Sequence, residues 1–100
     1  MELEFSGPLF EWRGPAPFVF VAVPEAHAEL IAEVAPLVTY GWGVIPATIT
    51  AGATRWTTSL FPKGGGYLVP VKSAVRKAER IEVGDTVALT VVLDVDPFGR

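Results

Sequence analysis

The stretch FVFVAVP at residues 18–24 decides the expected fold class. Six consecutive apolar residues are typical of a short strand with both faces buried, and Pro24 favours the first turn of a helix. The same order of features recurs at residues 66–70, GYLVP, where Pro70 stands 46 positions after Pro24. We therefore predict two β-β-α-β units, near residues 1–51 and 54–100, with Val23-Pro24 equivalent to Val69-Pro70.

Two short helices are expected after these prolines. An apolar stripe at helical spacing predicts the core face of the first, which Pro36 is expected to end soon afterwards. That stripe comprises Ala26, Leu30, Ile31 and Val34. Pro70 is expected to start the second helix, whose predicted core face comprises Val71, Ala74, Val75, Ala78 and Ile81.

The remaining segments show the alternation of half-buried strands. Residues 1–12 alternate with a bend or bulge at Gly7-Pro8, and residues 87–95 form the last strand. Residues 44–50 and 55–61 predict a hairpin, in which Pro46 indicates an edge or a bulge. The run PKGGG at 62–66 predicts a flexible loop. The expected fold is mainly β with two short helices, a pseudo-symmetric β-barrel capped by a helix at each end.

Composition indicates one globular domain over residues 1–100, because half of the residues are apolar and 19% are charged. There is no cysteine, no apolar run long enough for a membrane span and no basic N-terminal leader, so we expect a cytoplasmic protein without a cofactor. The net charge is −3, and the two halves differ: residues 1–50 carry −5 and residues 51–100 carry +2.

Four segments carry a resemblance to a known family: YGWGVIP at 40–46, WTTSLFPK at 56–63, GGYLVPVKSAVRK at 65–77 and VGDTV at 83–87. They resemble the domain of unknown function 1905 family over nearly the whole chain. The resemblance implies a double-split β-barrel, similar in architecture to AbrB and MazE-like DNA-binding domains, in which two chains build one barrel. It implies no activity.

Basic and aromatic residues suggest where a ligand could bind. Lys72, Arg76 and Arg80 recur at helical spacing, and Lys63 precedes the glycine run without forming a Walker motif. We predict that basic residues and loop aromatics line a cleft beside the second helix. The candidate ligand-binding residues are Trp42, Lys63, Tyr67, Lys72 and Arg76. The alternative is a solvated helix face, with Arg76 paired to Glu79.

Other chemistry has little support in the sequence. His27 is expected at the surface, and no second His or Cys completes a zinc site. Asp94 and Asp96 are expected to aid solubility, and no catalytic residue is predicted.

Three functions follow from these residues. The first is a non-enzymatic binding module for a small anionic or aromatic ligand. The second is a DNA-binding regulator of AbrB-like type, which the negative net charge disfavours. The third is an enzyme with Lys63 or Lys72 as general acid. No membrane contact is expected, and the predicted oligomeric state is a monomer or a weak homodimer joined through a free edge strand.

Overall fold

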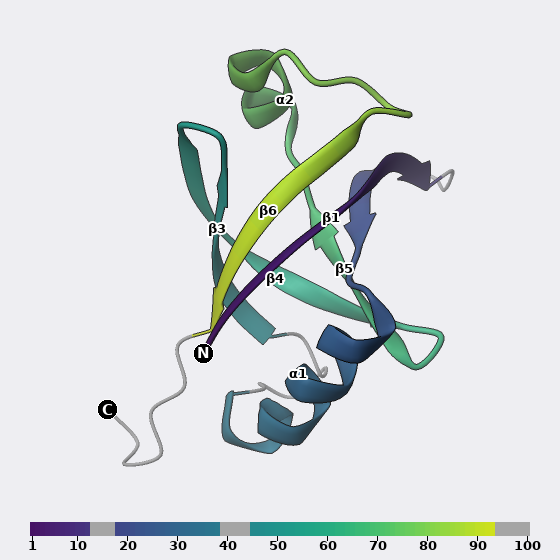
Figure 1. Ribbon diagram of the computed structural model, residues 1–100, viewed down its shortest axis with the longest axis vertical. Helices are drawn as coiled ribbons and strands as arrows, with labels where there is room; N and C mark the ends of the chain where they lie inside the picture. Colours follow the sequence, from purple (N-terminus) through teal and green to yellow (C-terminus); the bar gives the residue numbers. More distant parts are fainter. Residues whose placement is uncertain (13–17, 39–44, 94–100) are drawn as a thin grey trace.

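The computed structural model describes residues 1–12, 18–38 and 45–93 of the chain (Figure 1). Trp42, Asp94 and Asp96, which the sequence analysis singled out, lie outside the described residues. The elements are β1 (Glu2–Trp12), β2 (Phe18–Ala22), α1 (Glu25–Val38), β3 (Ile45–Ala51), β4 (Thr54–Lys63), β5 (Gly66–Pro70), α2 (Ser73–Glu79) and β6 (Thr86–Leu93). No helix within these ranges is long and apolar enough to cross a membrane.

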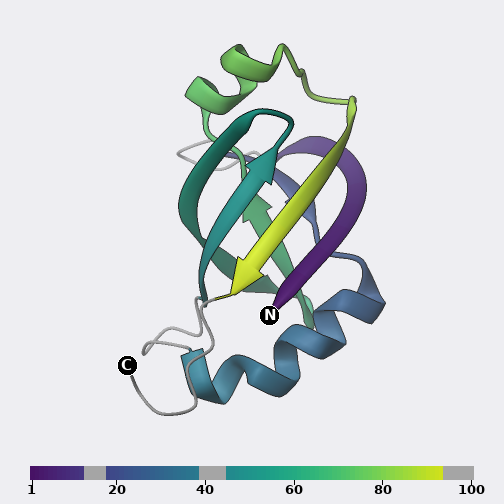
Figure 2. The ribbon, with the colours of Figure 1, turned by 60° about the vertical axis from the view of Figure 1, so that its left-hand side comes forward.

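The six strands close into an antiparallel barrel in the order β1-β2-β5-β4-β3-β6. If β1, β2 and β3 change places with β4, β5 and β6, respectively, the circular order of strands stays the same. A two-fold pseudo-repeat requires this. The helices α1 and α2 lie at opposite ends of the barrel (Figures 1 and 2). The predicted fold class, a mainly β barrel capped by two helices, is confirmed.

Alternation along the strands fills the barrel with apolar side chains. In β3 and β6 every second residue is buried, with Ile49 and Val91 fully inaccessible to solvent. β1 pairs with β6 up to Pro8 and with β2 from Leu9, so Gly7-Pro8 marks the predicted bend. A Cβ atom on Gly7 would lie 3.1 Å from the Val21 side chain, so glycine permits this close approach.

The predicted equivalence of Val23-Pro24 and Val69-Pro70 is wrong by two residues. The amide of Val23 donates to the carbonyl of Tyr67, and the amide of Val71 donates to the carbonyl of Val19, both at 2.9 Å. This reciprocal pair and the helix starts at Glu25 and Ser73 both relate residues 48 positions apart, so Val71-Lys72 corresponds to Val23-Pro24. A shift by two keeps every side chain on the same face of a strand, which is why alternation could not detect it.

Pro70 therefore does not start α2. It is the last residue of β5, paired with Phe20, and Lys72 is the N-cap residue of a helix that begins at Ser73. Pro24 does lie at the start of α1, where its carbonyl accepts a hydrogen bond from the amide of Ala28 at 2.8 Å. The prediction for Pro24 holds to within one residue, and the prediction for Pro70 is wrong.

Each helix buries a narrower stripe than predicted. In α1, Ile31 and Ala28 are buried, whereas Ala26 and Leu30 are exposed. In α2 only Val75 is buried, and the two alanines assigned to its core face, Ala74 and Ala78, are exposed. Both helices lie across an open end of the barrel, so only one line of side chains on each can reach the core.

Three further expectations need correction. Pro36 lies inside α1, which ends two residues later at Val38, because proline removes its own helical N–H hydrogen bond but does not stop the next residues from staying helical. The glycine run is a two-residue turn at Gly64-Gly65, both with positive φ, between the paired residues Lys63 and Gly66. His27 is half-buried, because its ring lies 5.5 Å from the ring of Phe5 on β1.

The barrel also removes the predicted route to a dimer. Among the described strands, each pairs with two neighbours, so no edge strand is free to pair with another copy. Pro46 is accommodated because β3 pairs with β6 only from Ala47 to Thr50, which leaves Pro46 paired on one side, with β4.

Candidate functional site

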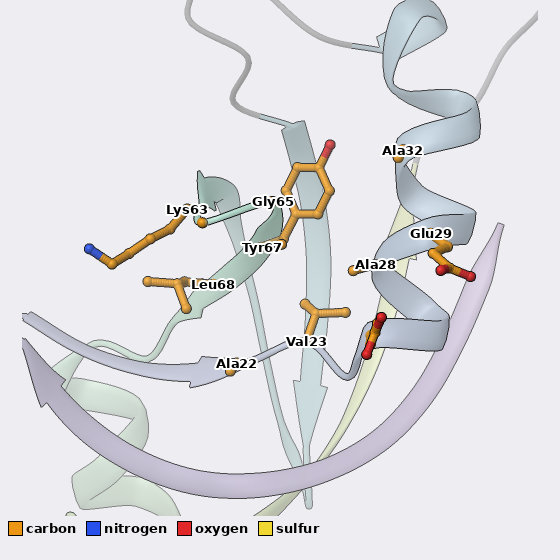
Figure 3. A pocket seen from close by; sticks show the side chains of 12 residues that line it. Ala22, Val23, Ala28, Glu29, Ala32, Lys63, Gly65, Tyr67 and Leu68 are labelled. Carbon is orange, nitrogen blue, oxygen red and sulfur yellow. The ribbon is translucent and has the colours of Figure 1, made fainter.

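A groove lies at each end of the barrel, between a helix and the strands beside it. The α1 groove, of about 450 Å³, runs between the first turns of α1 and the β4–β5 hairpin (Figure 3). The α2 groove, of about 300 Å³, runs between the start of α2 and strands β2 and β4. Small-molecule sites in proteins begin near this size.

The two grooves occupy equivalent places in the pseudo-repeat. Val23 lines the α1 groove and its counterpart Val71 lines the α2 groove. Tyr67 and Val19 correspond in the same way, and each belongs to the reciprocal hydrogen bonds that join the two units. The backbone therefore builds one groove twice, and side chains decide what each can bind.

The α1 groove carries charges of both signs. Glu25 and Glu29 line its α1 side, and Lys63 and Tyr67 line its hairpin side. The Lys63 chain extends away from α1 (Figure 3), and its Nζ lies 3.2 Å from the centre of the Trp12 ring. This cation–π contact directs the only basic side chain of the described lining away from the two carboxylates. An anion in this groove would meet the carboxylates first.

The α2 groove combines basic, hydroxyl and aromatic side chains. Its described lining contains no carboxylate and includes Phe18, Trp56, Thr57, Lys72, Ser73 and Arg76. Phe18 is 56% exposed, whereas Trp56 is buried, with 6% exposure. This groove therefore offers positive charge next to a flat apolar wall.

Backbone contacts hold two of these side chains in place. The Arg76 Nε donates to the Val71 carbonyl at 3.2 Å, which leaves the terminal guanidinium N–H groups available. The Trp56 Nε1 donates to the Pro70 carbonyl at 3.3 Å, which fixes the indole against β5. Lys72, the N-cap residue of α2, is exposed and has no such restraint.

A family model described as a domain of unknown function (DUF1905) matches residues 5–91 of the chain. The chain belongs to this family. The matched range runs from β1 into β6, so both grooves lie within the DUF1905 domain. A comparison with curated proteins finds no match.

The structure of this DUF1905 domain separates the predicted site residues. Lys63 and Tyr67 lie together in the α1 groove, whereas Lys72 and Arg76 lie together in the α2 groove. Arg80 does not continue the basic stripe, because it is the left-handed C-cap residue of α2, with φ 54° and ψ 47°. The alternative pairing of Arg76 with Glu79 is also absent from the contacts of Glu79, which accepts a hydrogen bond from the Thr54 hydroxyl.

Sequence reasoning missed the aromatic part of the α2 groove. Phe18 was assigned to a strand buried on both faces, yet it is the most exposed large apolar side chain of the described residues. The available signal was the sequence GPAP at residues 14–17 just before it, because Gly and Pro favour turns and strand ends beside turns are often exposed. In the described ranges, no group of three or more His, Asp or Glu residues could hold a metal ion.

Proposed function

We propose that this domain is a binding module for a small ligand that joins an anionic group to an aromatic or other flat apolar part. The observation that carries the proposal is the lining of the α2 groove. There Lys72 and Arg76 lie beside the exposed ring of Phe18, with no carboxylate among the described lining residues.

Each part of such a ligand has a partner in the groove. The Arg76 guanidinium and the Lys72 ammonium can hold a carboxylate or a phosphate, and the Ser73 hydroxyl can donate a further hydrogen bond. The flat part can stack on Phe18. A hydrogen bond to a charged group contributes about 1.5–3 kcal/mol, so two such contacts in an open groove give weak to moderate affinity.

The other candidate residues, Trp42, Lys63 and Tyr67, stay predictions and are not assigned to the anion. Lys63 and Tyr67 share the α1 groove with Glu25 and Glu29, a combination that suits a ligand with a cationic group better than an anion. Trp42 lies outside the described residues. The anion is therefore assigned to Lys72 and Arg76 alone.

The test is a binding series monitored by amide NMR shifts. We compare an aromatic carboxylate, its uncharged amide, inorganic phosphate, a nucleotide and, at low salt, a short DNA duplex. The proposal expects the carboxylate to shift the amides of residues 72–76 and to bind more tightly than its amide. Tight, salt-sensitive binding of the duplex would favour the DNA-binding alternative instead.

A pair of lysine variants makes the test specific. Lys72→Ala should weaken binding of the carboxylate about tenfold, because it removes one charge that contacts the ligand. Lys77→Ala is the matched control, since Lys77 lies on the same helix and is exposed but does not line the groove. Equal affinity of both variants for the carboxylate, or no response to any small anion, would refute the proposal.

A further inference from the structure

The outer face of strands β1, β2, β5 and β4 carries a cluster of large apolar side chains. We call it the aromatic face, and it comprises Phe10, Trp12, Phe18, Phe20, Phe61 and Leu68. Phe20 lies at its centre, with its ring 6.1 Å from the rings of Phe10, Phe18 and Phe61.

Strand register explains why these residues share one face. Phe10 pairs with Phe20, Trp12 pairs with Phe18, and Phe61 pairs with Leu68, so each pair points outward together. The neighbours almost fully bury Phe20, at 6% exposure, but Phe18, Phe61 and Trp12 stay 56%, 44% and 39% exposed. Three large aromatic side chains on one face form a patch typical of an interaction surface.

The two ends of the aromatic face carry opposite charges. At one end, Glu25 and Glu29 of α1 lie in the groove beside the outward-facing residues Ala22 and Leu68. At the other end, Lys72 and Arg76 lie in the groove beside the outward-facing residues Phe18 and Pro70. Lys63 also lines the acidic end, but its Nζ lies 3.2 Å from the centre of the Trp12 ring and so within the aromatic face. The face therefore has a mainly acidic end, an aromatic part that also holds the Lys63 ammonium, and a basic end.

A second copy of this chain has the matching surface. We propose that the aromatic face binds the same face of a second copy in an antiparallel arrangement, as a homodimer with a two-fold axis. Two-fold dimers place one patch against itself, so an apolar centre meets an apolar centre. Because the described strands form a closed barrel, association of copies has to use a face and not strand pairing.

Charge selects between the two ways of placing these faces together. In a parallel dimer the acidic ends meet each other and the basic ends meet each other, which is repulsive twice. In the antiparallel dimer Glu25 and Glu29 of each copy face Lys72 and Arg76 of the other, which is attractive twice. The inference goes beyond the proposed ligand and does not depend on it, although both use Lys72 and Arg76.

Sedimentation velocity over a concentration series through the micromolar range tests self-association. The wild-type chain should shift from monomer to dimer, and Phe61→Ser should weaken the dimer at least tenfold by removing an exposed anchor. Val92→Ser is the matched control, because Val92 is 38% exposed on the opposite, β1-β6-β3 side of the barrel. Phe18→Ser is a second variant at the aromatic face, should Phe61→Ser fail to fold.

A charge-reversal cycle tests the antiparallel arrangement. Glu29→Lys and Lys72→Glu should each weaken the dimer about tenfold at low salt, and the double variant should regain most of the loss. In a parallel dimer each single variant would instead replace a like-charge contact by an opposite-charge contact, so Glu29→Lys and Lys72→Glu would each strengthen the dimer.

Three outcomes would overturn the proposal. The first is a chain that stays monomeric at every concentration. The second is a dimer that Phe61→Ser and Phe18→Ser leave unchanged, which would place the interface elsewhere. The third is a double charge variant as weak as the single variants. None of these outcomes concerns small anions, so they are distinguishable from a failure of the proposed function.

Discussion

The α1 and α2 grooves have the same backbone plan and opposite chemistry. At three corresponding positions, 48 residues apart, the α1 groove region has Pro24, Glu25 and Ala28. The α2 groove region has Lys72, Ser73 and Arg76 there. A carboxylate is replaced by a hydroxyl, and two uncharged residues are replaced by cations. The repeat therefore fixes where grooves form, and a few side chains give the α2 groove basic groups and no carboxylate among its described lining residues.

The helices that border the grooves also differ in how they are held. α1 has 14 residues and is anchored by the fully buried Ile31, whereas α2 has seven residues and one buried side chain, Val75. A polar contact supplements this anchor, since Glu79 at the end of α2 accepts a hydrogen bond from Thr54 beside the β3–β4 turn. The candidate site thus rests on the shorter and less deeply anchored helix.

The largest expected effect is a loss of stability when the buried side chain that anchors each helix, Ile31 in α1 or Val75 in α2, is shortened. Ile31→Ala should lower the free energy of unfolding by about 3–4 kcal/mol, and Val75→Ala by about 2 kcal/mol, because the larger side chain leaves the larger cavity. Urea denaturation followed by circular dichroism measures both. Leu30→Ala is the control for Ile31→Ala, because Leu30 is the preceding residue and is 43% exposed. An equal loss for both anchors would contradict the ranking of the helices.

A pair of glycine variants tests the polar contact beside α2. Gly52 and Gly64 both have φ +58°, so alanine at either position costs about 1 kcal/mol of backbone strain. At Gly52 an added Cβ would also collide with the Glu79 carboxylate, whereas at Gly64 no atom lies within 4 Å. We expect a loss of about 2–3 kcal/mol for Gly52→Ala and about 1 kcal/mol for Gly64→Ala.

The excess cost of Gly52→Ala should depend on Glu79. In a Glu79→Ala background the collision and the hydrogen bond are both gone, so Gly52→Ala should then cost about as much as Gly64→Ala. Thermal unfolding of the wild type, Gly52→Ala, Glu79→Ala and the double variant completes this cycle. If the excess persists without Glu79, the extra cost of Gly52→Ala comes neither from the Glu79 carboxylate nor from its hydrogen bond with Thr54.

Most of the fold could be predicted because it depends on alternation, which the sequence records residue by residue. Buried strands, the bend at Gly7-Pro8 and the two β-β-α-β units all follow from apolar periodicity. The register between the units could not be predicted, since a shift of two residues preserves alternation. The three-dimensional structure reveals it, through the reciprocal hydrogen bonds of Val23 and Val71 and through helix starts at Glu25 and Ser73, 48 residues apart.

The candidate site was less predictable because its parts come together only through the barrel. Lys72 and Arg76 were found from their spacing, and they do share a groove. Phe18 and Trp56 join them there from β2 and β4, strands that lie on either side of β5. Lys63 is close to Lys72 in sequence, yet β5 intervenes and places it in the other groove. Proximity in sequence was a poor guide across a complete strand.

The smallest expected effect concerns the C-terminus of α2, where Arg80 has the left-handed conformation. Glycine adopts this conformation without the steric cost that a side chain brings, so Arg80→Gly should stabilise the domain by about 0.5–1 kcal/mol. The backbone amide of residue 80 still donates to the carbonyl of Lys77, and the amide of Ile81 still donates to that of Arg76. Thermal unfolding should show a melting temperature higher by roughly 2–6 °C.

Arg80→Ala is the control for this substitution, since it removes the same charge and keeps the strain. It should leave the melting temperature nearly unchanged, and neither variant should alter anion binding, because Arg80 does not line the α2 groove. A lower melting temperature for both variants would mean that the Arg80 side chain stabilises the helix end by more than its backbone strain costs. In that case α2 would be held by its charged side chains as well as by Val75, and the contrast with α1 would be sharper.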